Sequence, residues 1–300
     1  MPGVPGLFTD QQAAGWKRVV DAVHEKGGYI YCQLWHAGRV TIPQMTGTPP
    51  VAPSATPWDS PTETYSHPPV GASQPPLYVD HPPIELSVEH IQRTIEDYRR
   101  AARTAMDIGF DGVEVHGGNG YLPEQFLMSN INKRTDDYGG TPEKRCRFVL
   151  ELMDAIAQSI GEHNLSIRLS PFGLFNQARG DQRVETWTHL CQSLKQAHPA
   201  LSYVSFIEPV CFPPFIQYKY VGLTRENSAT SKSSATKKKT NSSKAGASAT
   251  STSTASARSS AQPPSSQPVA GTTKTPGACW SPAATMRSSS VVCSPVTRIW

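Results

Sequence analysis

Helix-like and strand-like spacings of apolar residues alternate along the first 223 residues. Short apolar runs predict strands over residues 29–34, 112–116, 165–170 and 201–207. Helical spacing predicts helices over residues 8–24, 87–108, 141–160 and 185–197, with Thr9, Ser87 and Thr141 as caps of the first three. This β-α alternation favours a parallel sheet with right-handed crossovers, built as a barrel or as a doubly wound sheet.

One connection is far longer than the others. Residues 43–83 are rich in proline and too polar for core strands, so we expect them to lie over the surface. Connections of this length in compact domains are often functional lids.

Composition changes sharply in the last quarter of the chain. Residues 224–300 carry ten Lys and Arg against one acidic residue, so the net charge of +4 belongs to this segment. Of its 77 residues 43 are Ser, Thr or Ala, and Ile299 is the only Ile or Leu. Such a composition cannot supply a hydrophobic core. We therefore predict an α/β domain over residues 1–209 and a low-complexity, disordered tail over residues 210–300.

The remaining composition excludes several classes of protein. No run approaches the ~20 apolar residues of a membrane helix, and residues 1–15 lack a secretory pattern. The six cysteines are scattered without a C-x-x-C pair, so we expect unpaired thiols and no metal site. We expect a cytoplasmic protein with no membrane or nucleic-acid partner.

Polar residues gather at the carboxyl ends of the predicted strands. In a (β/α)8 barrel these ends form the active-site rim. One interpretation of the rim is a metal-dependent hydrolase that uses His36, His116 and Glu208, but it gives the segment Asn119–Tyr121 no role. The polar residues at the four strand ends are Gln33, His36, His116, Asn119, Arg168 and Glu208.

The segment HGGNGY, residues 116–121, suggests a different chemistry. His116 and Asn119 are two neutral donors that can polarise one carbonyl or nitro oxygen. Tyr121 can then donate a proton, because a phenol with a pKa near 10 protonates only a strongly basic carbon such as a developing enolate. Arg168 would supply a fixed positive charge beside an electron-rich ring or enolate.

Three segments together resemble the Old Yellow Enzyme family of FMN-dependent NAD(P)H oxidoreductases. The resemblance covers roughly residues 5–209. It rests on YCQLWHAGR (residues 31–39), HGGNGYLPEQFLMSNINKRTDDYGG (residues 116–140) and IRLSPFG (residues 167–173). Members of this family are (β/α)8 barrels that reduce FMN with NAD(P)H and pass a hydride to the β-carbon of an activated alkene.

The resemblance implies a role for individual residues. Gln33 resembles the residue that binds the flavin pyrimidine edge, and Arg168 the one that stabilises the reduced flavin near N1. Tyr121 resembles the proton donor to the α-carbon. His116 and Asn119 resemble the catalytic pair that binds the substrate's activating oxygen, and Trp35 resembles a wall of the substrate pocket.

The resemblance also indicates that the barrel is partial. Only its third to sixth strands can be found, with nothing like the seventh and eighth in the Ser/Thr/Ala-rich tail. The predicted fold is therefore a partial (β/α)8 TIM barrel. The alternative to an ene-reductase is a catalytically inactive fragment, or a misannotated gene product, that holds FMN weakly or not at all.

The genetic code offers an explanation for the tail. If the coding bases are read one frame over, the codons of residues 262–271 can encode TPFFSAGGW, and those of residues 291–300 can encode a motif that ends in SNPDL. These two sequences resemble the family's seventh and eighth strands. Val210-Cys211 can be encoded as the splice donor GTATGT, and an acceptor can end within Ser228. The enclosed 56 nucleotides are not a multiple of three. Our hypothesis is a retained short intron over residues 210–228, followed by a shifted frame.

This hypothesis predicts a second transcript. Amplified cDNA across the codons for Val210 to Ser228 should contain a form shorter by 56 nucleotides, because those bases would be removed by splicing. Sequencing of the cDNA measures it directly. A transcript population that always keeps these bases would contradict the hypothesis.

Overall fold

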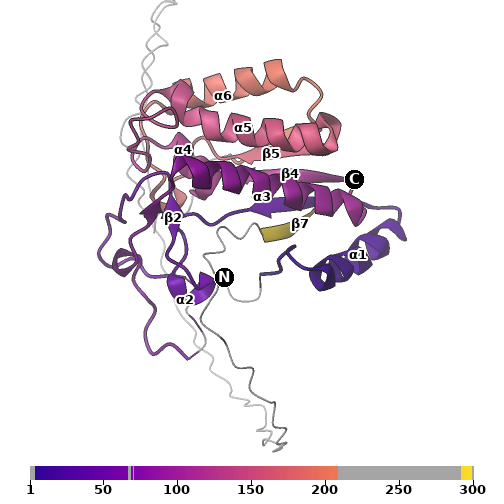
Figure 1. Cartoon of the computed structure of the whole chain (residues 1–300), viewed down its shortest axis with the longest axis horizontal. Coiled ribbons are helices and arrows are strands. Elements are labelled where there is room, and N and C mark those ends of the chain that lie inside the picture. The colour runs from indigo at the N-terminus through magenta and orange to yellow at the C-terminus, as the bar shows by residue number, and fades with distance from the viewer. Residues whose placement is uncertain (1–3, 67–68, 70, 209–291, 299–300) are drawn as a thin grey trace, which may run out of the picture. The chain divides into compact units, whose positions relative to one another are not determined.

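A computed structural model describes residues 4–66, 69, 71–208 and 292–298 (Figure 1). Among these residues no helix has the length and apolarity needed to cross a bilayer. The strands are β1 (Tyr29–Trp35), β2 (Val51–Ala52), β3 (Ile84–Glu85), β4 (Gly112–Gly117), β5 (Leu165–Leu169), β6 (Tyr203–Phe206) and β7 (Val292–Arg298). The α-helices are α1 (Asp10–His24), α2 (Pro43–Thr46), α3 (Val88–Asp107), α4 (Leu122–Leu127), α5 (Pro142–Ile160) and α6 (Arg183–Ala197), and the 3-10 turns are η1 (Tyr78–Asp80), η2 (Glu162–Asn164) and η3 (Phe175–Gln177).

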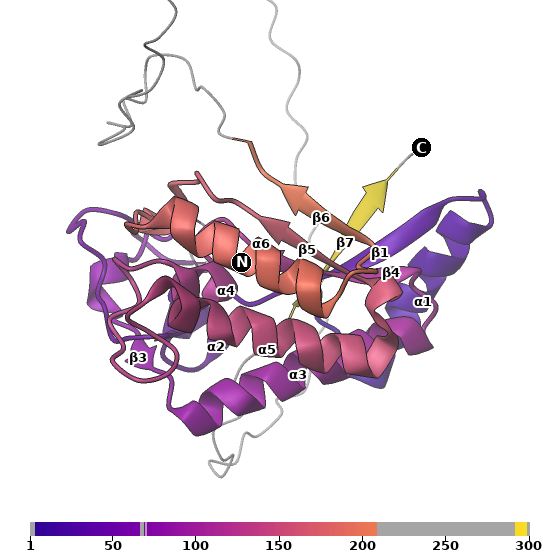
Figure 2. The same cartoon turned by 90° about the horizontal axis from the view of Figure 1, so that it is seen from above.

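The main sheet has the order β6-β5-β4-β1-β7. Its first four strands are mutually parallel, whereas β7 pairs antiparallel with β1. Helices α3, α5 and α6 lie along one face of the sheet (Figure 2). Parallel neighbours require such crossover connections, so the structure has the predicted β-α alternation.

The core lies between the sheet and these helices. Side chains alternate between the two faces of a strand, and one set from each parallel strand packs against the apolar stripes of α3 and α5. Residues of this core with no more than a few per cent exposure include Ile30, Leu34, Val113, Val115, Ile167, Leu169, Ile91, Tyr98, Phe148, Leu152 and Ile156.

The predicted helix caps are confirmed. The hydroxyls of Thr9, Ser87 and Thr141 accept hydrogen bonds from backbone N–H groups three residues later, over 3.2, 3.2 and 3.4 Å. Each bond satisfies a donor that has no partner within its own helix. The cap of α1 is reciprocal, since the Gln12 side chain accepts from the backbone of Thr9.

The apolar residues of the predicted helix over residues 8–24 are only partly buried. Trp16 and Val20 are buried, but Phe8 is 55% and Val19 is 42% exposed. Helix α1 packs against β1, and the contact covers a narrow stripe of the helix. The helical spacing over residues 8–24 therefore predicted the helix, and the structure shows that only Trp16 and Val20 of it are buried.

Two details of the structure differ from what the sequence predicted. Residues 292–298 lie in the segment expected to be disordered, yet they form β7. Strand β1 would otherwise end the sheet with unpaired backbone groups, and any extended segment can pair with such an edge. Cys32 forms a disulfide, so it is not the unpaired thiol expected. Residues 209–291 lie outside the described residues.

The proline-rich connection has a small core of its own. The rings of Trp58 and Tyr78 stack with centroids 4.0 Å apart, and Tyr65 lies edge-on to Tyr78. The Arg39 guanidinium carbon lies 5.0 Å from the Trp58 ring centroid and its nitrogens donate to backbone carbonyls of this connection. Tyr121 packs against the same cluster. The connection is therefore anchored beside the strand ends.

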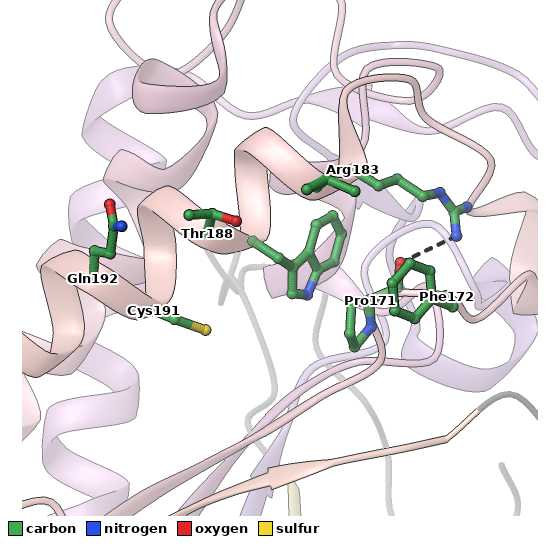
Figure 3. Close-up of a pocket in the computed structure, with 8 residues that line it drawn as sticks. Pro171, Phe172, Arg183, Thr188, Cys191 and Gln192 are labelled. Carbon is green, nitrogen blue, oxygen red and sulfur yellow. Dashed lines mark hydrogen bonds between the residues drawn. The ribbon is translucent and has the colours of Figure 1, made fainter. Parts of the chain in front are cut away.

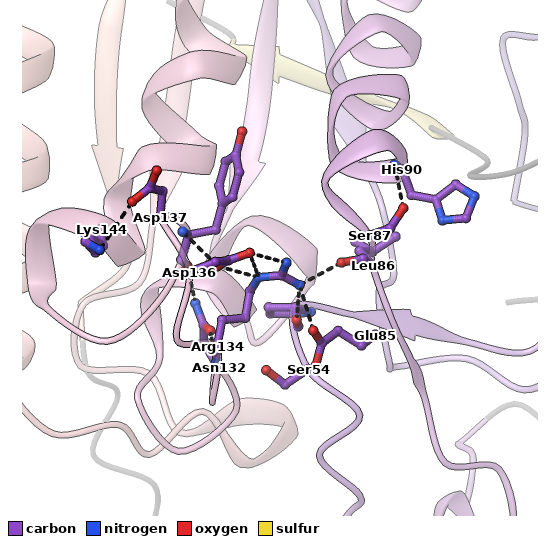
Figure 4. A network of polar contacts seen from close by, with 12 residues as sticks. Ser54, Glu85, Leu86, Ser87, His90, Asn132, Arg134, Asp136, Asp137 and Lys144 are labelled. Atoms are coloured by element: carbon purple, nitrogen blue, oxygen red, sulfur yellow. Dashed lines mark hydrogen bonds and ion pairs between the residues drawn. The ribbon is translucent and has the colours of Figure 1, made fainter.

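Arg134 joins the segment after α4 to the loops around β2 and β3 (Figure 4). Its side chain is 5% exposed. Nη1 donates to the carbonyl oxygens of Pro53 (2.8 Å) and Leu86 (2.6 Å), and Nε and Nη2 donate to Asp136 over 2.9 and 2.5 Å. One cation thus satisfies two buried carbonyls and a carboxylate from three stretches of chain.

Replacing Arg134 with Met should lower the free energy of unfolding by roughly 2–3 kcal/mol, because two buried carbonyls and Asp136 lose their donor. Asp136 is 38% exposed, so water limits its share of the loss. Urea unfolding measures the effect. Lys17→Ala is the control, since its exposed ion pair with Asp21 should contribute less than about 1 kcal/mol. Equal stabilities of the two variants would contradict this account of Arg134.

Candidate active site

Parallel pairing brings three of the predicted residues to one edge of the sheet. His116 on β4 is the direct cross-strand partner of Arg168 on β5, and Trp35 is the last residue of β1. Successive side chains point to opposite faces of a strand. These three side chains therefore lie on the face opposite the helices, since the residues that precede them are buried in the helix-side core: Leu34, Val115 and Ile167.

The turn after β4 brings Tyr121 back over this edge. Asn119 and Gly120 both have left-handed backbone conformations, with φ of 56° and 71°. Tyr121 then stands at the start of α4. Its ring centroid lies 5.4 Å from that of His116 and 4.9 Å from that of Trp35, with an edge-on approach to the indole. Trp35, His116 and Tyr121 thus form one aromatic cluster.

His116 is electrically neutral at pH 7. Its side chain is buried, and burial, assisted by the positive charge of Arg168, lowers its pKa from 6.5 to about 4. Its Nδ1 atom and the Nε1 atom of Trp35 are buried without a hydrogen-bond partner among the described residues. Buried polar atoms normally have partners. A bound ligand would satisfy this pair.

Tyr121 keeps its proton over the neutral range. Burial raises the pKa of its phenol, and a hydrogen bond with the Asn176 side chain opposes that effect in part. Asn176 lies in η3, which follows β5. The phenol is consequently a proton donor held in place by a side chain from the next strand-end loop.

Gln33 and Arg168 differ in how their donors are used. Gln33 Nε2 donates to Glu114 Oε2 on the neighbouring strand over 2.6 Å, which uses one of the two amide hydrogens. The half-buried guanidinium of Arg168 makes no hydrogen bond or ion pair within the described part of the chain. Five N–H donors at this edge are therefore available to an anionic ligand.

Three residues that the sequence analysis missed hold the turn after β4. The Ser170 hydroxyl accepts from the backbone N–H of Asn119 over 2.8 Å and donates to Glu124 Oε1 over 2.7 Å. Asn176 Nδ2 donates to the carbonyl oxygen of Asn119 over 2.7 Å. The available signal for Glu124 was that it is the one acidic residue in LPEQFL, a segment that is apolar apart from Glu124 and Gln125.

A separate groove lies on α6 and on the loop that follows β5 (Figure 3). Its volume is about 380 Å³, and it contains none of the predicted site residues. The guanidinium of Arg183 at its rim donates to the carbonyls of Pro171, Gly173 and Ala178. We assign this groove no catalytic role, because its lining is mainly apolar and the guanidinium of Arg183 is already bonded to backbone carbonyls.

The residues of the alternative hydrolase do not assemble. His36 Nδ1 accepts from the N–H of Gly38 over 2.9 Å, and burial lowers its pKa to about 4. Glu208 is exposed beyond the end of β6. In the described ranges no three His, Cys, Asp or Glu side chains are grouped so that they could hold a metal ion.

The electrostatic coupling of His116 to Arg168 can be measured. By NMR, the imidazole of His116 should titrate near pH 4. In Arg168→Gln the midpoint should rise but stay below 6.5, because the cation is lost while burial, the larger cause, remains. Arg93→Gln, at an exposed ion pair on α3, should leave the midpoint unchanged. An unchanged midpoint in Arg168→Gln would contradict the coupling.

Comparison with protein families gives one match that spans most of the chain. Residues 1–256 match the model of the NADH:flavin oxidoreductase / NADH oxidase family. Flavin oxidoreductase hxnT of Emericella nidulans is 44% identical over 213 residues, which cover 69% of this chain and 52% of the relative. 12-oxophytodienoate reductase 1 of rice is 41% identical over the same shares. The chain spans about half the length of these relatives.

Solved structures agree with the sequence match. Morphinone reductase in complex with tetrahydroNAD is 40% identical with a TM-score of 0.63, over 70% of this chain and 57% of that one. The old yellow enzyme homologue from Zymomonas mobilis is 32% identical with a TM-score of 0.60, over 67% and 54%. The described sheet and its helices therefore correspond to part of a TIM barrel. The chain belongs to the NADH:flavin oxidoreductase / NADH oxidase family, the family of Old Yellow Enzyme.

Proposed function

We propose that this chain carries the chemistry of an ene-reductase, which transfers a hydride from FMN, reduced by NAD(P)H, to an activated carbon–carbon double bond. The packing of Trp35, His116 and Tyr121 beside Arg168 carries this proposal. A rice relative named 12-oxophytodienoate reductase and a structural relative named morphinone reductase support a small unsaturated substrate.

The donors at the strand ends fit the ring end of FMN. Gln33 retains one amide N–H and its carbonyl oxygen for the pyrimidine edge, since its other N–H is bonded to Glu114. Arg168 has a guanidinium without a partner in the described part, which suits the anionic charge of the reduced ring. Bound FMN would supply the two electrons as a hydride. Gln33 and Arg168 would bind and orient the ring.

His116 and Asn119 would bind the activating oxygen of the substrate. A pKa of about 4 makes the imidazole of His116 neutral at pH 7. The neutral ring can donate a hydrogen bond to the substrate oxygen but, unlike an imidazolium, does not act as an acid toward it. The left-handed turn at Asn119 follows His116 by three residues. Two neutral donors on one oxygen favour the enolate-like charge that develops in the transition state.

Tyr121 would complete the reduction. The hydride adds to the β-carbon, and the phenolic proton goes to the α-carbon, so that one hydride and one proton are added across the double bond. The raised pKa keeps the phenol protonated until a strongly basic carbon forms. Trp35, in edge-on contact with Tyr121, would form the wall that limits how a substrate lies against the phenol.

The alternative is a catalytically inactive fragment that cannot hold FMN. Two observations favour it: the described part contains four parallel strands, and the chain spans about half of its relatives. In this alternative residues 1–209 form a partial barrel, and residues 210–300 are the product of a retained intron and a shifted frame.

Flavin absorbance and turnover separate the two functions. The full chain should bind FMN and oxidise NADPH with cyclohexenone, and Tyr121→Phe should lower turnover by about 10²–10⁴-fold because the proton donor is lost. FMN affinity should be the same in both proteins, since the hydroxyl does not hold the flavin.

The control is Tyr29→Phe, which removes a hydroxyl from a residue that is 64% exposed at the opposite end of β1. It should leave turnover unchanged. A full chain that binds no FMN establishes the inactive alternative. Binding of FMN with equal turnover in wild type and Tyr121→Phe would remove Tyr121 from the mechanism.

A further inference from the structure

We infer that Glu124, acting with Ser170, is the positioning residue that holds the turn carrying Asn119 and Tyr121. The inference deepens the proposed function, because that turn presents two of the groups assigned to substrate. The catalytic consequence of this inference rests on the proposed function. The hydrogen bonds that hold the turn do not, because they form between residues of the chain itself.

The turn needs external support. Left-handed backbone costs most non-glycine residues roughly 1–2 kcal/mol and Asn less. Asn119 adopts it directly before Gly120, for which it carries no such cost. Gly120 also lies against η3, so that a Cβ added there would be 2.5 Å from the carbonyl oxygen of Phe175. Strained conformations of this kind persist only where neighbouring groups fix them.

Two acceptors fix the N–H groups of the turn. The N–H of Gly120 donates to Glu124 Oε2. The N–H of Asn119 donates to Ser170 Oγ over 2.8 Å, and Ser170 Oγ donates in turn to Glu124 Oε1 over 2.7 Å. Both left-handed N–H groups therefore depend on the same carboxylate, one directly and one through a hydroxyl.

Two side-chain amides fix the carbonyl groups of the turn. Asn176 Nδ2 donates to the Asn119 oxygen over 2.7 Å, and Gln125 Nε2 donates to the Gly120 oxygen over 2.8 Å. With all four peptide groups bonded, the turn has one defined conformation. Loss of the carboxylate would release both N–H groups and leave only the carbonyl side held.

The arrangement differs from an ordinary helix cap. Glu124 is the third residue of α4, and a capping-box glutamate there would accept from the N–H of the cap residue Tyr121. The Tyr121 N–H instead bonds to the Gly118 carbonyl over 3.3 Å. Glu124 reaches one residue further back, to Gly120, and uses its other oxygen for Ser170. Capping α4 would require neither bond.

The pKa of the Glu124 carboxyl group lies near neutral pH. Its side chain has no exposed surface, and burial raises its pKa to about 7 against the lowering effects of the Gly120 N–H, Ser170 and Arg183. Arg183 on α6 is the charged side chain that acts on it, and Arg183 itself donates to three backbone carbonyls. The bonds made by Ser170 therefore depend on a group that titrates in the neutral range.

The two histidines and the tyrosine on neighbouring elements stay neutral at pH 7. Burial lowers the pKa of His36, whose carbonyl accepts from the first N–H of α4, and that of His116 on β4 to about 4. Burial raises the pKa of Tyr121. A pH-dependent change in the turn near neutrality is consequently assigned to Glu124.

Protonation would reverse the bond between Glu124 and Ser170. A protonated carboxyl can donate to Ser170 Oγ, whereas the carboxylate only accepts from it. The substitution Glu124→Gln would mimic the protonated form, since the amide N–H would donate to Ser170 and the amide oxygen would accept from Gly120. Glu124→Gln should therefore preserve the turn but remove its response to pH, whereas Glu124→Ala should release the turn.

The test uses NMR of the full-length chain without FMN. In wild type, the Gly120 amide shift should titrate with a midpoint near pH 7, and Glu124→Gln should abolish that titration. Amide exchange at Asn119 should accelerate at least tenfold in Glu124→Ala and in Ser170→Ala, while the β4 amides of Val113 and Val115 keep their protection. The control is Glu89→Gln, which lies at an exposed ion pair on α3 and should change neither quantity.

Each outcome decides the inference. If Glu124→Ala does not fold, Ser170→Ala and Glu124→Gln supply the result. A Gly120 shift that titrates equally in wild type and in Glu124→Gln overturns it, as does unchanged exchange at Asn119 in Ser170→Ala. Because no readout uses flavin or turnover, failure of the ene-reductase function leaves these results intact. If the chain does turn over, Glu124→Ala should raise KM for cyclohexenone with FMN affinity unchanged.

Discussion

The register of the parallel strands is the constraint on which the rest of the site depends. Side chains alternate along a strand. The pairing of His116 with Arg168 therefore fixes which side chains point toward the helices and which point toward the open face. A shift of one residue would turn the imidazole of His116 toward the helices and Val115 toward the open face. The helices on one face therefore determine the chemistry that the other face presents.

Burial gives the two groups assigned to substrate their complementary protonation states. The same loss of water that lowers the pKa of His116 to about 4 raises the pKa of the Tyr121 phenol, because in each case it disfavours the charged form. Arg168 strengthens the effect on His116. A neutral donor beside a neutral acid is the combination that addition to an activated alkene needs.

Local sequence patterns predicted the helices, the strands and the helix caps. Features that depend on contacts between distant residues could not be predicted from the sequence. Thr9, Ser87 and Thr141 act on amides three residues away, so their caps were readable from the sequence. The bond from Ser170 to Glu124 joins residues 46 apart, and no local pattern announces it. The exposure of Val19 follows from how little of α1 the sheet covers. The pairing of β7 likewise depends on a partner more than 250 residues away.

The described half of the barrel carries the residues assigned to the reaction but only part of the contacts that FMN binding would need. Every residue assigned to the reacting atoms comes from the ends of β1, β4 and β5 or from the turn after β4, and the bonds that hold that turn also come from this half. Binding of a large cofactor instead draws on contacts along its whole length, and association must first overcome several kcal/mol of lost freedom. A partial barrel can thus keep the geometry of the reaction in its own hydrogen bonds while holding only one end of the flavin. The proposed reductase and its inactive alternative therefore share one structure and differ in a single quantity, the free energy of FMN binding.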